Sequence, residues 1–318
     1  MTILCSGSLA FDRLMYYPGI YAESFMPDKL DMINVSFLVD RVERAYGGTA
    51  GNVAYNLGLL GEKPLIIGSL GDDPDGEDYR QRLSGWSFPL EGIGVKKGFM
   101  TAGCTIATDR NNNQLTFFHP GAMLEPSGFD PSTLPQPYDQ HLAIVSAGGL
   151  VEMKSLCADY RRLGLPFIFD PSQQIHAFSG PELVEMLDES LMFTCNEYEF
   201  ELFKKITGLS SEEVFRHTQS VIVTRGENGA DLLVAGRGSQ NVSAVPVQTV
   251  VNPTGAGDAF RAGLLKGLAN REHLITSCRL GSTVAAFCVE VAGTQDQVFT
   301  PRDVAARHAA TFKEQINL

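Results

Sequence analysis

One segment of the chain, VNPTGAGDAFRAGLLKGL at 251–268, places a carboxylate directly after a glycine turn. Phe260, Leu264 and Leu268 recur every four residues, a spacing that predicts a helix with one buried stripe. The glycine turn therefore stands at the N-terminus of this helix, where backbone amides lack a partner within the helix and the helix dipole is positive. Such an N-terminus is typical of an anion-binding site.

The first turn of the predicted helix adds a base to the anion site. Gly255, Ala256 and Gly257 are small enough for an anion to approach their amides, and Asp258 follows them. A carboxylate here can take a proton from a substrate hydroxyl while the amides hold charge on a transferred phosphoryl group. The alternative is a glycine-capped helix in which Asp258 only interacts favourably with the dipole.

The common motifs for other nucleotide and hydrolytic chemistry do not occur. GLLGEK at 58–63 has the wrong spacing for a P-loop, and Pro64 follows it. The chain also lacks a Rossmann G-x-G-x-x-G after its first strand, an H-E-x-x-H, a C-x-x-C pair and a G-x-S-x-G elbow. The glycine turn before Asp258 is therefore the strongest catalytic signal.

Composition limits the class of protein. The chain has 318 residues, which fits a single domain over 1–318, and its net charge of −12 with no basic face argues against nucleic-acid binding. The six cysteines are scattered, which is typical of reduced thiols in a cytoplasmic protein. The start, MTILCSGSLAF, is not typical of a signal peptide, and no apolar run reaches the length of a membrane span. We expect a cytoplasmic protein without a membrane partner.

Alternating short apolar runs and helical patterns predict an α/β fold. A mostly parallel central sheet with helices on both faces follows from this alternation. The predicted strands lie at 3–7, 64–71, 141–147, 166–170, 191–196 and 220–226, and the predicted helices at 47–61, 71–83, 255–268 and 273–290. Ligands of such sheets bind beyond the carboxyl ends of the strands. The residues after these strands should therefore line one crevice.

Further strands lie outside this alternation. They are predicted at about 12–18, 31–44 and 99–119, the last as a hairpin around 111–113, where asparagine tolerates positive φ. We expect them to form a small β-strand lid over the crevice.

Two motifs resemble those of one enzyme family. GGTAGNVAYNLGLLG at 47–61 and NPTGAGDAFRAG at 252–263 resemble the two signatures of the ribokinase-like (PfkB) carbohydrate and nucleoside kinases. The resemblance covers nearly the whole chain in order. It implies a ribokinase-like, Rossmann-type fold and transfer of a phosphoryl group from ATP, with Mg²⁺, to a small-molecule hydroxyl.

The resemblance also implies roles for individual residues. Asp258 resembles the catalytic base, and Gly255, Ala256 and Gly257 resemble the anion hole. The implied substrate-binding residues are Ser8, Asp12, Gly48, Thr49, Asn52 and Phe118. The implied ATP-binding residues are Asn196, Glu199, Thr224, Gly226 and Gly229, with Glu199 supporting Mg²⁺ through water. Simpler alternatives are a strand-end turn, helix caps, a capping box at 196–199 and a strand exit at 224–226.

The acceptor is predicted from the same resemblance. Residues 36–52 and 117–123 are most similar to the bacterial adenosine-kinase branch, in which Phe37, Phe117 and Phe118 would offer faces to a purine. Packing of these side chains into a small lid core is the alternative, and Cys104 stands where some relatives carry an aromatic residue. Adenosine is the first candidate acceptor, giving AMP and ADP. A sugar kinase of the ribokinase or fructokinase type is the second, and a catalytically silent nucleotide-binding sensor is the third.

One departure from the family concerns cations. Asn252 and Pro253 stand where the family usually has aspartate and threonine, and that aspartate often helps to hold a monovalent cation. Asn252 keeps an oxygen but loses the charge, so activation by K⁺ is left open. Lid strands in this family sometimes pair across a dimer, and a homodimer is therefore an assembly that the resemblance allows.

Overall fold

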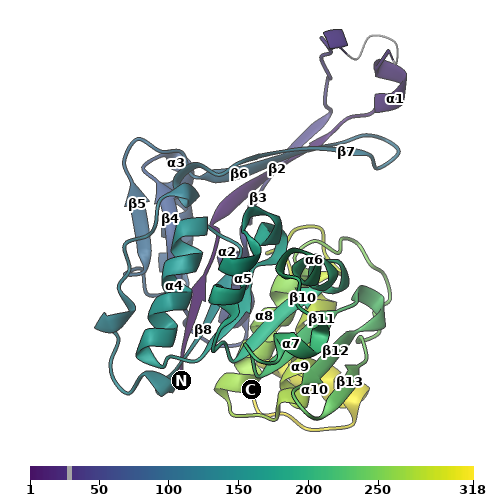
Figure 1. Ribbon diagram of the computed structural model, residues 1–318. Helices are drawn as coiled ribbons and strands as arrows, with labels where there is room; N and C mark the ends of the chain where they lie inside the picture. The colour runs from purple at the N-terminus through teal and green to yellow at the C-terminus, as the bar shows by residue number, and fades with distance from the viewer. Residues whose placement is uncertain (27–30) are drawn as a thin grey trace.

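Short apolar runs form a nine-stranded sheet in the computed structural model, which describes residues 1–26 and 31–318 (Figure 1). The strands are β1 (Thr2–Ser6), β4 (Leu65–Gly71), β5 (Ile93–Lys96), β8 (His141–Ser146), β9 (Phe167–Asp170), β10 (Met192–Asn196), β11 (Ser220–Thr224), β12 (Ala230–Val234) and β13 (Gly238–Val242). Their order is β13-β12-β11-β10-β9-β8-β1-β4-β5. All neighbours are parallel except β12 with β11 and with β13.

The central strands are buried on both faces. In β8, Leu142 and Ile144 join one hydrophobic cluster, while Ala143 and Val145 join the cluster on the opposite face. This alternation follows from the two-residue period of a strand. It requires a layer of helices on each face.

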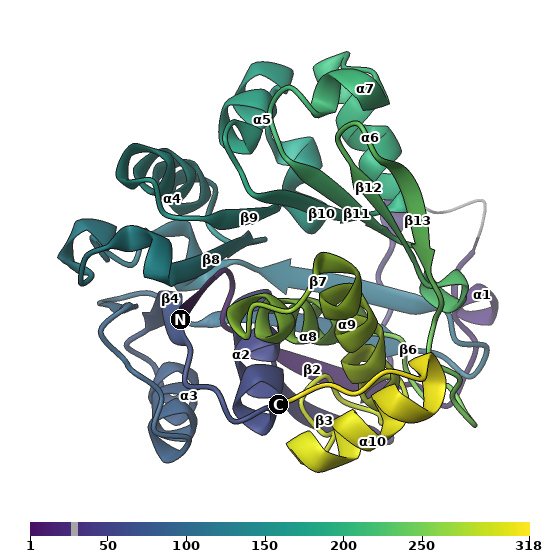
Figure 2. The same ribbon diagram turned by 90° about the horizontal axis from the view of Figure 1, so that it is seen from below.

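Two helical layers supply that cover (Figure 2). One layer contains α4 (Leu150–Leu163), α5 (Gly180–Leu187), α6 (Glu197–Thr207) and α7 (Ser211–Val214). The other contains α2 (Thr49–Leu59), α3 (Pro74–Gly85), α8 (Ala256–Ala269), α9 (Leu274–Cys288) and α10 (Pro301–Phe312). The predicted α/β fold, a mostly parallel central sheet with helices on both faces, is confirmed. In the described part of the chain, no helix has the length and apolar character that crossing a membrane requires.

A second sheet projects from this body (Figure 1). Its strands, in the order β3-β2-β6-β7, are β3 (Arg41–Gly47), β2 (Ala10–Tyr16), β6 (Ala102–Thr108) and β7 (Gln114–His119). β6 and β7 pair antiparallel, as the predicted hairpin requires, and Asn112 in their turn has a φ of 62°.

The strand expected over 31–44 begins only at Arg41. Residues 33–39 form no strand, although their apolar residues alternate. The ring of Phe37 instead packs against Tyr17 and Tyr21, at centroid distances of 4.9 and 5.0 Å, beside the short helix α1 (Tyr21–Ser24). Of the alternating residues, Phe37 joins this aromatic cluster, whereas Ile33 and Val35 are exposed. The alternative, packing of Phe37 into a small lid core, is observed, and its contact with a purine stays a prediction.

Candidate active site

The glycine turn predicted at 255–257 forms the N-terminus of α8. Gly255 has a φ of 82°, and a Cβ at this position would come within 2.9 Å of Thr294. Only glycine suits this backbone and this contact. The amide of Ala256 donates to the carbonyl oxygen of Pro253 at 3.2 Å. Of the three amides predicted as an anion hole, that of Ala256 is thus engaged in a turn.

Asp258 lies in the first turn of α8, and its side chain is 14% exposed. Burial raises the pKa of this carboxyl to about 6, with Asp170 and Asp12 adding to the rise while Arg261 and Asn52 oppose it. A carboxylate with such a pKa is ionised at neutral pH and is still basic enough to accept a proton. This balance suits a general base.

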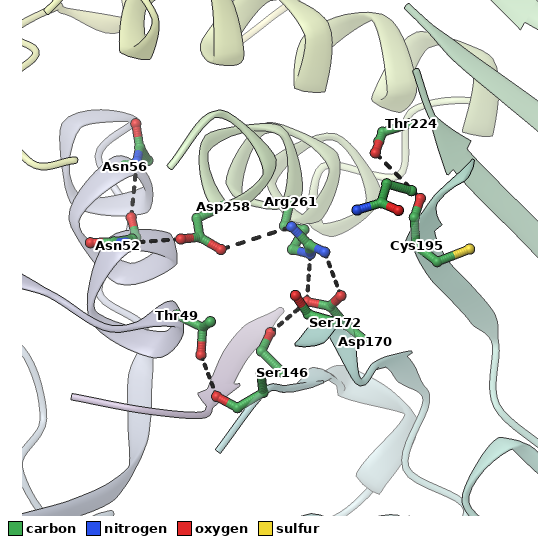
Figure 3. A network of polar contacts seen from close by, with 12 residues as sticks. Thr49, Asn52, Asn56, Ser146, Asp170, Ser172, Cys195, Thr224, Asp258 and Arg261 are labelled. Carbon is green, nitrogen blue, oxygen red and sulfur yellow. Dashed lines mark hydrogen bonds and ion pairs between the residues drawn. The ribbon is translucent and has the colours of Figure 1, made fainter. Parts of the chain in front are cut away.

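Asn52 from α2 holds the carboxylate of Asp258. Its Nδ2 donates to Asp258 Oδ2 at 2.8 Å (Figure 3). Its Oδ1 accepts from Thr294 Oγ1 and Gln295 Nε2, each at 3.1 Å. The sequence predicted that Asn52 binds a substrate hydroxyl. In the structure its amide instead orients the candidate base, a contact across 206 residues that no local pattern reveals.

Ser8 follows β1, and Gly48 and Thr49 begin α2. The polar groups of these residues bond to the chain itself. The amide of Thr49 donates to Ser8 Oγ at 3.0 Å, and Thr49 Oγ1 donates to the carbonyl of Ala147 at 2.7 Å. Gly48 has a φ of 88°, and a Cβ there would meet the Ser8 carbonyl oxygen at 2.5 Å. These residues join β1, α2 and β8, and they shape the edge of the crevice.

Asp12 of β2 differs from Ser8, Gly48 and Thr49 in how its polar atoms are used. It is half-buried, burial raises its pKa, and its oxygens have no hydrogen-bond partner within residues 1–26 and 31–318. Register places Asp12 beside Cys104, and Cys104 beside Phe118, so the three side chains share one face of the second sheet. Phe117 points to the other face because successive strand residues alternate. Its predicted contact with the same ligand is therefore wrong.

The predicted ATP residues gather at the carboxyl ends of two neighbouring strands. Asn196 ends β10 and pairs with Thr224 at the end of β11, whose Oγ1 donates to the carbonyl of Cys195 at 3.3 Å. Gly226 is exposed in the next turn, whereas Gly229 is buried, with a φ of 83°. The strand ends thus lie together, as the fold predicted.

Asn196 and Glu199 form a capping box at the start of α6. The amide of Glu199 donates to Asn196 Oδ1, and the amide of Asn196 donates to Glu199 Oε2, both at 2.8 Å. Glu199 is buried, which raises its pKa, although the backbone bond from Asn196 lowers it. Ser172 Oγ also donates to Glu199 Oε1 at 3.3 Å. The capping alternative is therefore correct, and it also aims a buried carboxylate at the crevice.

Sequence reasoning missed an ion pair beside Asp258. The guanidinium of Arg261 pairs with Asp170 through Nε and Nη2, the latter bond measuring 2.6 Å, and Ser146 Oγ donates to Asp170 Oδ2 at 2.9 Å (Figure 3). An arginine three residues after Asp258 on a helix was a visible signal. Its partner 91 residues away was not.

Asn252 closes the loop behind the N-terminus of α8. Its Nδ2 donates to the carbonyl of Ala292 at 2.7 Å, and its Oδ1 accepts from the amide of Thr254 at 2.9 Å. The side-chain amide thus places an N–H against a carbonyl oxygen.

The parallel sheet, the projecting second sheet and the carboxylate at a glycine-capped helix N-terminus define a kinase of ribokinase fold. A family model described as pfkB family carbohydrate kinase matches residues 7–301. The chain belongs to this family of small-molecule kinases, which confirms the resemblance of its two motifs.

Several individual proteins to which the chain is similar are nucleoside kinases. The chain is 35% identical to the nucleoside kinase of Burkholderia thailandensis in complex with inosine, with a TM-score of 0.86 over 99% of each chain. The same enzyme in complex with ADP-inosine gives a TM-score of 0.84. A nucleoside kinase of Methanocaldococcus jannaschii is 25% identical over 96% of each chain.

Proposed function

We propose that this kinase transfers a phosphoryl group from ATP to the 5′-hydroxyl of a purine nucleoside, with adenosine as the first acceptor, giving AMP and ADP. Such a reaction would return a free nucleoside to the nucleotide pool, as in purine salvage. The observation that carries the proposal is the carboxylate of Asp258, nearly buried, oriented by Asn52 and adjoining a helix N-terminus.

The chemistry follows from the chain's own groups. The acceptor hydroxyl gives its proton to Asp258, while the amides of Gly255 and Gly257 and the dipole of α8 hold charge on the phosphoryl group. The free oxygens of Asp12 can accept hydrogen bonds from two vicinal hydroxyls of a ribose. This arrangement selects an acceptor with a diol and a neighbouring primary alcohol.

The nucleoside assignment is supported by relatives and by the second sheet. The structure of the Burkholderia thailandensis enzyme contains inosine, and its similarity to this chain covers 99% of each chain. Phe118 shares a face with Asp12 and is 50% exposed, so its ring is available for stacking on a base. Closure of this sheet as a lid would exclude water and limit ATP hydrolysis.

Magnesium would enter with the nucleotide. The described residues hold no group of three or more side chains suited to a metal ion. Mg²⁺ usually keeps several waters and uses one or two carboxylates besides the phosphates, so the buried carboxylate of Glu199 fits support through water. Bound in this way, the ion would neutralise charge on the phosphates.

A panel of acceptors tests the proposal, with ADP formation measured by a coupled assay. Adenosine and inosine should give values of kcat/KM at least about tenfold above those for ribose and fructose, a difference of about 1.4 kcal/mol. Titration calorimetry should show binding of a nucleoside and none of the sugars. A preference for ribose or fructose would overturn the nucleoside assignment and favour the sugar-kinase alternative.

We also propose that the partner of the second sheet is another copy of this chain. Val42, Met15, Ala107 and Leu115 lie opposite one another across β3, β2, β6 and β7, which puts an apolar row on one face of the projecting sheet. Val42 is 57% exposed. A two-fold axis would bury this row against itself and give a homodimer.

A further inference from the structure

A nearly buried arginine lies between two carboxylates at the first turn of α8. The side chain of Arg261 is 11% exposed and that of Asp170 is 1% exposed. Nη1 of Arg261 lies 3.8 Å from Asp258 Oδ1, while Nε and Nη2 pair with Asp170. One guanidinium thus joins the candidate base to the carboxyl end of β9.

The backbone of α8 accommodates this side chain at one position. A Cβ on Gly257 would come within 2.6 Å of Arg261 Nη1. Arg261 therefore lies along the face of the first turn, three residues after Asp258 and four after Gly257, as helix geometry allows. Gly257 leaves space for the guanidinium as well as for an anion.

The sheet fixes the guanidinium from the other side. Asp170 is the last residue of β9, and Ser146, the last residue of β8, donates to its Oδ2 at 2.9 Å. A two-point carboxylate pair restrains the planar guanidinium in orientation as well as in distance. The position of Arg261 therefore depends on two strands, and not on α8 alone.

Charges around the crevice give Arg261 a clear electrostatic role. Three carboxylates favour its charged form, those of Asp170 on β9, Asp258 on α8 and Glu199 on α6. A fourth carboxylate, Asp12 on β2, acts on Asp258. Burial opposes the charged guanidinium, but Asp170 and Asp258 raise its pKa above the usual value, so it stays positive.

The remaining neighbours of Asp258 carry no compensating charge. Asn52 reaches it from α2, and Cys288 on α9 has its pKa raised by burial and, to a smaller extent, by Asp258.

We propose that Arg261 is a positioning residue for phosphoryl transfer: held by Asp170, it fixes the carboxylate of Asp258 toward the acceptor hydroxyl and offsets the negative charge around it. This inference rests on the proposed function, in which Asp258 is the base. Without the guanidinium, Asp258 would face Asp170 in a poorly solvated site, and its ionised form would be less stable.

The first test follows the titration of Asp258 itself. In ¹³C NMR spectra, the carboxyl signal that disappears in Asp258→Asn identifies this residue. Arg261→Met should move its midpoint to higher pH, whereas Arg307→Met, which breaks a partly buried pair with Glu290 that includes neither Asp258 nor Asp170, should leave it unchanged. An unchanged midpoint in a folded Arg261→Met protein would overturn the proposal. This measurement needs no turnover, so it remains informative if the wild-type chain phosphorylates none of the acceptors.

The second test uses kinetics and two milder variants. Arg261→Lys keeps the charge but loses the fork, and Asp170→Asn keeps the volume but releases the guanidinium. Both should lower kcat toward the ~10²-fold loss expected from a misplaced catalytic group, with KM for the nucleoside nearly unchanged. Arg261→Lys should also keep the acidic limb of the pH profile near that of wild type. Wild-type kcat in both variants would show that Arg261 has only a structural role.

Discussion

At the scale of single residues, the proposed function depends on the protonation of Asp258. Its pKa of about 6 lies well above the ordinary 3.8 because the side chain is buried, and the base is active only when ionised. We expect kcat/KM to fall tenfold per pH unit below about pH 6 and to be level above it. A rate profile from pH 4.5 to 9 with a saturating concentration of ATP checks this. An acidic limb centred near pH 4 would mean that the site is well solvated in solution.

The raised pKa of Asp258 also makes the stability of the fold depend on pH, in a direction that follows from the shift. The folded state binds the proton of Asp258 more tightly than the unfolded state does, so this group stabilises the fold at low pH. That contribution should be lost as pH rises from about 4 to about 6. Thermal melts should show a smaller loss over this interval for Asp258→Asn than for wild type, since asparagine cannot titrate.

Removing the base should separate chemistry from binding. Asp258→Ala is expected to lower kcat by roughly 10²–10⁴-fold, the usual range for a lost general base. Calorimetry should show nearly unchanged affinity for ADP, because the amides of the helix N-terminus remain. A loss in turnover below tenfold would mean that another group takes the proton.

We expect Asn252 to make the loop behind α8 independent of a monovalent cation. Its Nδ2 bonds the Ala292 carbonyl at 2.7 Å, which already satisfies that oxygen. We expect equal kcat in KCl and in tetramethylammonium chloride at matched ionic strength. Asn252→Asp would set a carboxylate against the carbonyl, so its activity should depend on K⁺. Strong stimulation of wild type by K⁺ would contradict this prediction.

At the scale of elements, sequence patterns predicted the features that depend only on residues close together in the chain. The helix that carries Asp258 was predicted at 255–268 and observed at Ala256–Ala269, because its apolar repeat and its glycine cap are local. Residues 33–39 alternate in the same way and yet form no strand: Phe37 packs on two tyrosines, while Ile33 and Val35 are exposed. An alternation of apolar and polar residues fits a strand, but it does not show whether the segment pairs with a neighbouring strand.

The orientation of the site could not be read from the sequence. Asn52 meets Asp258 across 206 residues, and Arg261 meets Asp170 across 91. Each contact depends on how α2 and α8 pack on the ends of the strands. The family resemblance implied a substrate contact for Asn52, and an amide side chain can both bind a ligand and orient a neighbouring residue.

The two faces of β7 supply a matched pair of variants. Phe118 shares a face with Asp12, whereas its neighbour Phe117 points away and is 67% exposed. Stacking on a base is worth about 1–3 kcal/mol, so Phe118→Ala should raise KM for adenosine about 5- to 150-fold. Phe117→Ala should leave KM within about twofold, which is small beside the stacking energy. Equal effects of both variants would mean that the sheet, and not the ring, provides affinity.

At the scale of the whole molecule, the projecting sheet has two different faces, one of which carries Asp12 and Phe118. The row formed by Val42, Met15, Ala107 and Leu115 lies on the face opposite Asp12, since odd and even positions of β2 alternate. Burying these side chains in a dimer would stabilise the sheet at about 25 cal/mol per Å² of apolar surface. It would also rigidify the strands that carry Asp12 and Phe118.

Light scattering coupled to size-exclusion chromatography tests this assembly. The wild-type chain should elute as a dimer, and Leu115→Asp should elute as a monomer because a carboxylate inside the apolar row loses its hydration. Thr116→Asp, one residue further and on the other face, should remain dimeric. Because the sheet would lose its support in the monomer, KM for the nucleoside should rise in Leu115→Asp while Asp258 keeps its titration. A monomeric wild type with full activity would show that the row needs no second copy.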